Sequence, residues 1–229
     1  MRFKYLLLIY ILGLWCGLAQ AQPKQIHLEY EVKRDGKPFA TVKEDFTQDG
    51  KTYQIQSVTK GVGIYALFGE RVLTSAGDVT NEGLRPKRFE LKQGDNPKKT
   101  LIADFDWTQN QLNMQVKGKL KTEPLQPGTQ DLVSYPYQFM FRPPQKGAVN
   151  VTLTTGKKLN TYQYQAEEVA PQTLAGQSVN ILQLDTMKGN DADRKQLWLA
   201  TNLHYLLMRY QQHEDGALLE QVITKISIQ

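Results

Sequence analysis

Two carboxylates with the spacing used in acid–base chemistry stand close together in the middle of the chain. Asp104 and Asp106 are two residues apart, so they would share one face of a strand, and Trp107 follows directly. Paired carboxylates serve as acid and base in glycoside hydrolysis. The apolar residues that alternate with them would point to the core, which leaves both acids on the wet face. We therefore expect a solvated strand, and keep a hydrolase centred on Asp104, Asp106 or Asp131 as an alternative.

The least generic polar group is the segment that contains Gln130, Asp131 and Ser134. These side chains could contact a ligand or a partner at the start of a helix. Asp131 or Ser134 could instead accept hydrogen bonds from the unpaired backbone N–H groups that every helix start presents. Because that need exists whatever the function, capping is the favoured interpretation.

Other catalytic arrangements find little support in the sequence. There is no G-x-S-x-G motif, and neither H-E-x-x-H nor C-x-x-C occurs. Among the three histidines, His27 falls on the polar face of a strand and His213 precedes a turn; only His204 stands beside an apolar strand. We predict no cofactor, no metal site and no enzymatic activity.

Aromatic side chains gather in the two segments that interrupt the strand pattern. The candidates for ligand contact there are Tyr65, Phe68, Tyr135 and Phe139. Such residues usually fill a core, but a rolled sheet with a helix in its mouth can also enclose an apolar ligand. An apolar or lipid-like molecule is therefore one predicted partner, and Trp107, Gln130, Asp131 and Ser134 complete the candidate contacts.

The elements that must position these residues are mostly strands. Apolar residues recur with period two, as in Ile26, Leu28, Tyr30 and Val32, a pattern typical of antiparallel sheets with one wet face. The pairs Asp35-Gly36, Asp49-Gly50 and Asp215-Gly216 suit the positive φ angles of hairpin turns. Two further strands, around Leu197-Trp198-Leu199 and Tyr205 to Met208, are apolar on both faces and should be deeply buried.

Two segments depart from this alternation. Residues 61–68 are apolar and glycine-rich, which indicates a short helical turn or a loop folded over the sheet. Residues 131–141 are the best helix candidate, ended by Pro143-Pro144. The predicted fold is mainly β, a strongly curved antiparallel sheet, open β-barrel or β-roll with one short helix on its concave side. Residues 22–229 should form a single domain.

The first 21 residues have the three zones of a cleavable export signal. Arg2 and Lys4 precede an apolar run, and Ala19-Gln20-Ala21 is a small-x-small cleavage site with the cut expected between Ala21 and Gln22. The apolar run is shorter than a bilayer span needs, so no stable membrane span is expected after cleavage. Cys16, the only cysteine, would leave with the signal. We expect a periplasmic protein without disulfides.

The charge balance argues against nucleic acid as a partner. The chain has 28 Lys and Arg against 23 Asp and Glu, and loss of Arg2 and Lys4 with the signal leaves a net charge of +3. Such a mildly basic chain favours anionic surfaces slightly.

An ordered series of short motifs resembles a known family. The motifs are Tyr30 with Gly36, then Tyr53, Gly61, Ser75-Ala76-Gly77, Gly83-Leu84-Arg85-Pro86, Phe105-Asp106-Trp107, Gln130-Asp131 with Ser134, and Leu197-Trp198-Leu199. Together they span nearly all of residues 26–228, and their order is similar to the bacterial exported domain-of-unknown-function family DUF3108. The resemblance implies a β-roll or open barrel and assigns no activity.

Three functions follow as hypotheses. The first is a non-enzymatic exported protein that binds an apolar or lipid-like envelope ligand, or an envelope protein. The second is a structural or scaffold protein of the cell envelope with a solid core, and the third is the hydrolase described above. A hollow concave side of the sheet would favour the first over the second.

Overall fold

The structure is built on the alternation that the sequence predicts. In β1 (Gln25–Arg34), Ile26, Leu28 and Tyr30 are almost completely buried, while His27 and Glu29 between them remain partly exposed. Burying alternate side chains gives a strand one apolar and one wet face. The predicted Asp35-Gly36 hairpin turn follows, with φ angles of 48° and 75°.

The computed structural model describes residues 22–94, 97–187, 194–214 and 216–229. The predicted signal with Cys16 and residue Asp215 of a predicted turn lie outside these ranges. The remaining elements are β2 (Lys37–Gln48), β3 (Thr52–Gly61), the 3-10 helix η1 (Gly63–Phe68), β4 (Arg71–Thr80), β5 (Gly83–Gln93), the 3-10 helix η2 (Pro97–Lys99), β6 (Leu101–Asp106), β7 (Gln111–Val116), β8 (Lys119–Pro124), β9 (Gln130–Asp131), α1 (Ser134–Phe141), β10 (Gly147–Thr154), β11 (Leu159–Leu174), β12 (Gln177–Thr186), β13 (Lys195–Ala200), β14 (Leu206–Glu214) and β15 (Ala217–Ile228).

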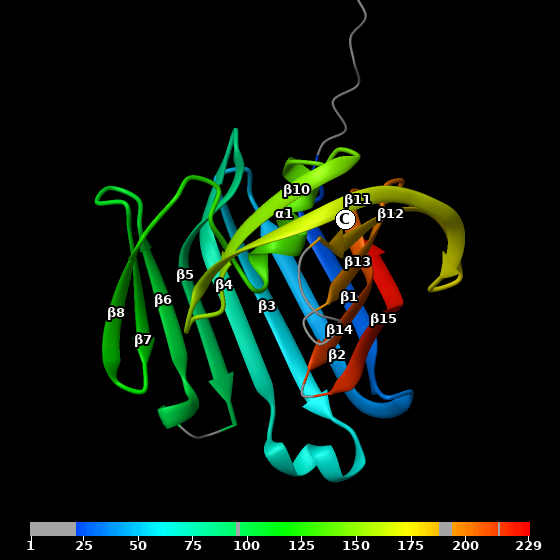
Figure 1. Cartoon of the computed structure of the whole chain (residues 1–229), viewed down its shortest axis with the longest axis horizontal. Helices are drawn as coiled ribbons and strands as arrows, with labels where there is room; N and C mark the ends of the chain where they lie inside the picture. Colours follow the sequence, from blue (N-terminus) through cyan, green and yellow to red (C-terminus); the bar gives the residue numbers. More distant parts are fainter. Residues whose placement is uncertain (1–21, 95–96, 188–193, 215) are drawn as a thin grey trace, which may run out of the picture.

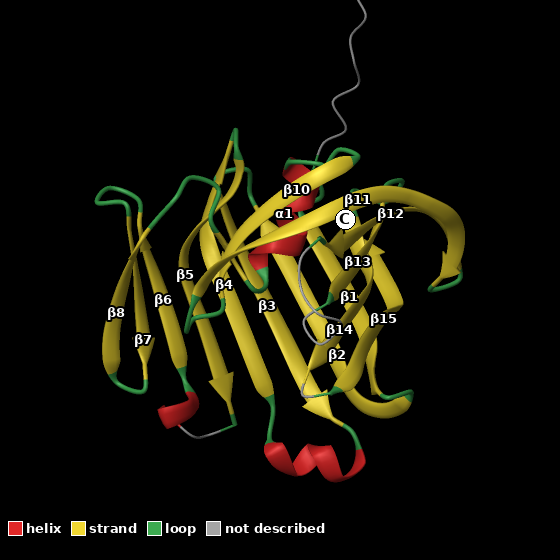
Figure 2. Ribbon diagram, viewed as in Figure 1, coloured by secondary structure: helices red, strands yellow, loops and turns green. Residues whose placement is uncertain are grey.

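Within the described residues, the strands form one sheet of 15 strands in the order β8-β7-β6-β5-β4-β3-β2-β1-β15-β14-β13-β12-β11-β10-β9. Neighbours are antiparallel, except that the two-residue β9 runs parallel to β10. The first and last strands pair in the middle of the sheet, with Ile26 opposite Ile228. The sheet curls so that β10 and β11 cross over its first half, and α1 lies between the two halves (Figures 1 and 2). This is the predicted strongly curved, open sheet.

The end of the sheet that contains β9 and β10 folds back onto the opposite half without closing into a barrel. Gln130 of β9 donates from Nε2 to the backbone oxygen of Leu84 in β5, 2.9 Å away. The hydroxyl of Thr154 at the end of β10 lies 3.2 Å from the sulfur of Met114 in β7. Side chains therefore join β9 and β10 to the opposite half of the sheet, where no strand pairing does.

The helix α1 fills one end of the roll. Its Tyr137 ring stacks on Phe46 of β2, with ring centroids 5.0 Å apart, and Tyr135 and Phe139 pack into a second apolar cluster with β10 and β13. The predicted helix was too long at its start, because Gln130 and Asp131 pair with β10 as a short strand. Its end agrees, since Phe141 is the last helical residue.

Two further predictions, for residues 197–199 and 61–68, can be compared with the structure. Leu197, Trp198 and Leu199 of β13 are all buried, as their apolar character on both faces predicts. The segment 61–68 is the short helical turn η1 rather than a loop folded over the sheet, since none of the residues of η1 is buried.

Candidate functional site

The roll contains a hollow between its two halves. This inner cavity has a volume of about 630 Å³. Its walls come from β2 to β6, from the first turn of α1, and from β10, β11 and β13 to β15. The lining residues are Val42, Glu44, Ser57, Thr59, Arg71, Leu73, Leu91, Leu101, Leu132, Val133, Tyr135, Pro136, Leu153, Thr155, Lys157, Tyr162, Tyr164, Lys195, Leu207, Tyr210, Gln212 and Gln221. The volume is in the range of ordinary small-molecule sites.

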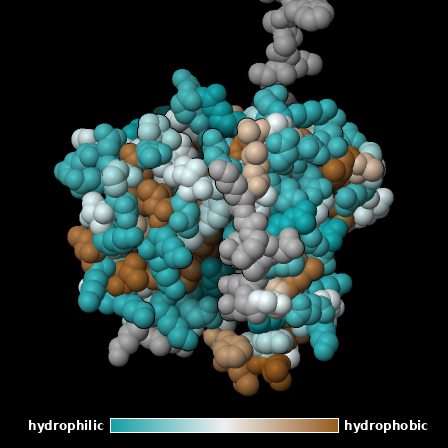
Figure 3. Space-filling model, viewed as in Figure 1, coloured by the Kyte–Doolittle hydropathy of each residue, from teal (hydrophilic) through white to brown (hydrophobic). Residues whose placement is uncertain are grey.

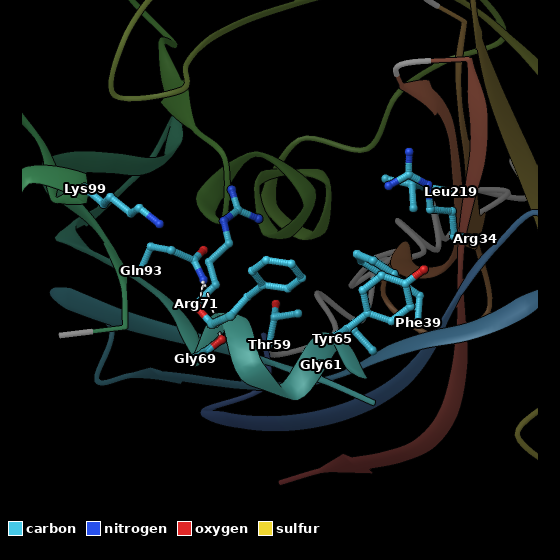
Figure 4. Close-up of a pocket in the computed structure, with 12 residues that line it drawn as sticks. Arg34, Phe39, Thr59, Gly61, Tyr65, Gly69, Arg71, Gln93, Lys99 and Leu219 are labelled. Atoms are coloured by element: carbon cyan, nitrogen blue, oxygen red, sulfur yellow. Dashed lines mark hydrogen bonds between the residues drawn. The ribbon is translucent and has the colours of Figure 1, made fainter. Parts of the chain in front are cut away.

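A second hollow, the mouth pocket, adjoins the inner cavity at the end of the roll where η1 lies. It measures about 450 Å³ and is lined by Arg34, Phe39, Ala40, Thr59, Gly61, Tyr65, Phe68, Gly69, Arg71, Gln93, Lys99 and Leu219. Thr59 and Arg71 line both spaces, so the two are contiguous. Figure 4 shows Arg71 and Arg34 rising from opposite sides of this pocket.

The two ends of the inner cavity differ in polarity. Arg71 begins β4 next to η1, and Leu73, two residues further on, faces the same interior. Lys195 likewise begins β13 opposite Gln212, whereas Leu207 lies at the other end of β14. The cations therefore stand toward the mouth and the apolar side chains toward α1. An elongated molecule with one polar and one apolar end matches this gradient.

Glu44 is the acidic residue that lines the inner cavity. Strand alternation carries it inward between Val42 and Phe46. Its carboxylate accepts hydrogen bonds from Ser57 Oγ at 3.0 Å and from the Tyr137 hydroxyl at 3.1 Å. Burial raises the pKa of Glu44, and the two hydrogen bonds offset part of this shift because they favour the ionised form.

Three of the predicted contact residues line these spaces. Tyr65 and Phe68 belong to the mouth pocket and Tyr135 to the inner cavity. Phe139 lies instead in the apolar cluster behind Tyr135, where the two rings meet edge to face with centroids 6.4 Å apart. The aromatic residues of the two irregular segments thus divide between the hollow and the core.

Gln130, Asp131 and Ser134 are buried outside both hollows. Asp131 accepts hydrogen bonds from the backbone N–H groups of Val133 and Ser134, and its own N–H donates to Ser134 Oγ at 2.9 Å. Its other oxygen accepts from Ser75 Oγ on β4 at 2.6 Å. The group thus satisfies the turn that enters α1, in agreement with the capping interpretation, and ties that turn to the sheet.

Burial raises the pKa of Asp131 to about 6, although the hydrogen bonds from Ser75, Ser134 and Val133 act in the opposite direction. Tyr53 extends the network, because its hydroxyl lies 3.0 Å from Ser75 Oγ.

The three acids of the hydrolase hypothesis do not converge. Asp104 is on the outer face of β6 in an ion pair with Arg88, with 2.7 Å between Nη1 and Oδ1. Asp106 accepts two backbone N–H groups of the turn that follows β6. Trp107 donates to the backbone oxygen of Pro86 at 2.6 Å, which fixes it to β5 and away from the inner cavity. Asp131 is buried on the opposite face of the sheet, with Ser75.

The residues that sequence analysis missed are the polar ones of the hollow. For Glu44 a signal was present, because it occupies the inward register between two apolar residues of the same strand. Arg71 and Lys195 carried no comparable signal, since their roles depend on which strand ends meet around the mouth. In the part of the chain that the structure describes, no three His, Cys, Asp or Glu side chains form a group that could hold a metal ion.

An open β-roll with a hollow interior and a cationic mouth is the class of protein that fold and site define. The model of the family described as protein of unknown function DUF3108 matches residues 29–216, and the chain belongs to that family. This confirms the predicted resemblance. No curated protein matches the chain. None of the described helices is both long and apolar enough to cross a bilayer.

One solved structure shows the same kind of fold. The chain is similar to the β-barrel-like protein of domain of unknown function DUF1849 from Brucella abortus, with a TM-score of 0.51 and 14% identity over 91% of this chain and 99% of that one. A putative outer membrane lipoprotein-sorting protein domain from Vibrio parahaemolyticus matches with a TM-score of 0.28 and 11% identity, over 90% of this chain and 85% of that one. At 14% identity, the similarity to the first structure supports the fold and nothing more. The similarity to the second is too weak to support any conclusion.

Proposed function

We propose that this protein is a non-enzymatic binder of an amphiphilic, lipid-like molecule, which it holds in the inner cavity. The observation that carries the proposal is the cavity of about 630 Å³, lined by both apolar and polar side chains from the two halves of the sheet. A scaffold with a solid core would fill this space, because protein interiors are close-packed and large voids are costly.

The polarity of the walls suggests how such a ligand lies. Leu73, Leu153 and Leu207 offer apolar surface to a hydrocarbon portion. Arg71 and Lys195 stand at the mouth end, where an anionic headgroup would meet them. Glu44 also lines the cavity, where hydrogen bonds from Ser57 and Tyr137 occupy its carboxylate oxygens. The preferred ligand is therefore an amphiphile with an anionic head.

We also propose that the protein works in the periplasm. The support is the predicted signal in residues 1–21. Intact-mass measurement of protein recovered from the periplasm of a bacterial host should show an N-terminus at Gln22. Protein that stays in the cytoplasm with residues 1–21 attached would contradict this part of the proposal.

A cavity-filling variant tests ligand binding. Thr59 lines both hollows, so the indole of Thr59→Trp would occupy their junction. We expect its affinity for cis-parinaric acid, measured by fluorescence titration, to fall roughly tenfold or more. The matched control is Thr41→Trp, an exposed position on the adjacent strand β2, paired with Lys60.

Two results would contradict the proposed ligand binding. One is a wild-type protein that neither binds the fatty acid nor carries any lipid detectable by native mass spectrometry after purification. The other is equal affinity in wild type, Thr59→Trp and Thr41→Trp, since binding would then lie outside the hollow.

A further inference from the structure

The 3-10 helix η1 presents an apolar surface to solvent. Its apolar tip consists of Val62, Ile64, Leu67 and Phe68, with exposed fractions of 42%, 74%, 88% and 69%. The other large exposed apolar residues in the described part of the chain, Leu120 and Met187, stand singly. In Figure 3 the apolar patch projects from the lower end of the molecule, where Figure 1 places η1. A projecting cluster of this kind marks an interaction surface.

The structure holds the tip outward. The ring of Tyr65 turns back and packs on Phe39 of β2, with centroids 4.6 Å apart, so one residue of η1 anchors the others. Gln93 of β5 donates to the backbone oxygen of Phe68 at 3.1 Å. A Cβ on Gly61 would lie 2.2 Å from the backbone oxygen of Tyr65, so only glycine permits this tight turn. These contacts hold the backbone of η1, and the four apolar side chains face solvent.

Positive charge surrounds the tip. The cationic rim consists of Arg34, Lys37, Lys60, Arg71 and Lys99. Arg34, Arg71 and Lys99 line the mouth pocket, and Lys37 and Lys60 stand at the ends of β2 and β3 that lead to it. Two acids stand beside it, and they are outnumbered by the five cations: Asp35 accepts the backbone N–H of Leu218 at 2.9 Å, and Glu70 pairs with Lys60 at 2.7 Å. Apolar side chains inside a cationic rim match a bilayer surface with anionic headgroups.

We propose that the apolar tip is a membrane-docking element that enters the surface of an anionic bilayer, while the cationic rim contacts the headgroups. Phe68 belongs to both the tip and the mouth pocket, so docking places the pocket against the lipid. If the proposed function holds, an amphiphile passes from that surface into the inner cavity; docking itself does not require this.

A membrane fits the surface better than a protein does. A second copy joined symmetrically through the tip would bring two cationic rims together, and like charges across an interface are unfavourable. Stable protein interfaces bury about 800 Å² on each partner, mostly over broad, complementary surfaces. A projecting tip of four side chains is better suited to insertion into a fluid surface.

Vesicle co-sedimentation of the full chain, purified after export, tests the docking. The vesicles are pure phosphatidylcholine, or equal parts phosphatidylcholine and phosphatidylglycerol. We expect binding to the anionic vesicles that weakens as salt is raised. The affinity of the double variant Ile64→Glu/Leu67→Glu for the anionic vesicles should be lower by roughly tenfold or more, because two carboxylates then replace the inserted apolar groups. The control, Leu120→Glu on the edge strand β8, should bind as wild type does.

A second readout separates docking from ligand binding. Ile64 and Leu67 line neither hollow, so the double variant should bind cis-parinaric acid in solution like wild type, which also shows that it is folded. Thr59→Trp should show weakened binding of the fatty acid and unchanged binding to the vesicles. If Thr59→Trp and Thr41→Trp bind the fatty acid equally, the proposed function fails while docking stands.

Several outcomes overturn the docking proposal. They are wild type that binds no vesicles, equal binding to neutral and anionic vesicles, and a double variant that binds like wild type. Sedimentation velocity supplies one more: a wild-type dimer that the double substitution dissociates would assign the tip to a second copy. Photo-crosslinking from position 67 to protein rather than lipid in intact cells would assign it to a protein partner.

Discussion

Tyr137 of α1 donates a hydrogen bond of 3.1 Å from its hydroxyl to the carboxylate of Glu44 on β2. The same tyrosine ring stacks on Phe46, two residues along that strand. One side chain thus joins the helix to the wall of the inner cavity through both an apolar and a polar contact. Tyr137 therefore couples α1 to the cavity wall.

We predict that Tyr137→Phe destabilises the protein by about 1–2 kcal/mol at neutral pH, because a hydrogen bond to a charged group is lost while the ring stays. This bond favours ionised Glu44, so its contribution is present at higher pH and is lost as pH falls through the pKa of Glu44. Urea unfolding at several pH values measures the effect.

The matched control is Tyr30→Phe, which removes an equally buried hydroxyl bonded to the backbone oxygen of Leu207 at 3.0 Å. Because that acceptor is neutral, the loss of about 1 kcal/mol should be independent of pH. The same pH dependence in both variants would show that the Tyr137 hydroxyl does not affect the ionisation of Glu44.

A second prediction concerns Asp131. Burial raises its pKa from 3.8 to about 6, so the neutral form is favoured in the fold. Its contribution to stability is fully present below the unfolded pKa and is lost as pH rises through about 6. The stability of Asp131→Asn relative to wild type should therefore increase between about pH 4 and about pH 7, by up to ~3 kcal/mol.

Asp49 is a control for which the pH dependence of stability should have the opposite sign. Backbone hydrogen bonds from Thr52 and Lys51 lower the pKa of this exposed carboxyl. Asp49→Asn should thus lose stability relative to wild type as pH rises. Parallel pH trends in Asp49→Asn and Asp131→Asn would contradict the role of burial at Asp131.

Local pattern predicted much of the fold. The alternation of Ile26, Leu28 and Tyr30 identifies a strand with one buried face, because side-chain direction depends only on neighbours in the chain. The start of α1 was placed too early, since Gln130 pairs with Leu153 of β10. That contact joins residues far apart in sequence, and so do the pairing of β1 with β15 and the curling of the sheet.

The candidate site was predictable only where composition was unusual. Tyr65, Phe68 and Tyr135 stood out as aromatic residues in irregular segments, and they line the hollow. Arg71 and Lys195 are ordinary strand-end cations until the sheet rolls and brings β4 and β13 to one mouth. Sequence therefore indicated an apolar interior but not the charge at its entrance.

A third prediction addresses that charge. The ammonium group of Lys195 lies 4.9 Å from the centre of the Tyr162 ring, and both residues line the inner cavity. Lys195→Met keeps most of the apolar contact and removes the cation. Affinity for cis-parinaric acid should fall roughly five- to tenfold, as expected for loss of one charge-assisted contact, and affinity for the corresponding alcohol should change little.

Lys87→Met is the control for this charge change, because Lys87 pairs with Asp78 on the outer face at 2.6 Å. It should leave both affinities unaltered. If Lys195→Met weakens the acid and the alcohol equally, Lys195 contributes packing and not headgroup recognition.

The last prediction tests how the turn after β10 packs on the opposite half of the sheet. Gly156, in the turn between β10 and β11, has φ of +80°, and a Cβ there would lie 3.1 Å from Cβ of Leu101 and 3.2 Å from Cε1 of Phe89. Gly176, in the turn between β11 and β12, has φ of +74° with nothing within 4 Å of such an atom. The two glycines share the same backbone requirement and differ in the contact.

Gly176→Ala should therefore cost only the backbone strain, about 1 kcal/mol, while Gly156→Ala should cost about 2–3 kcal/mol because it also pushes the turn away from β5 and β6. Urea unfolding of the two variants beside wild type measures the difference. Faster hydrogen exchange in β6 and β10 should accompany Gly156→Ala alone, since movement of the turn away from β5 and β6 exposes the contact between the two halves of the sheet. Equal losses of stability in the two variants would mean that the turn at Gly156 does not pack against Leu101 in solution.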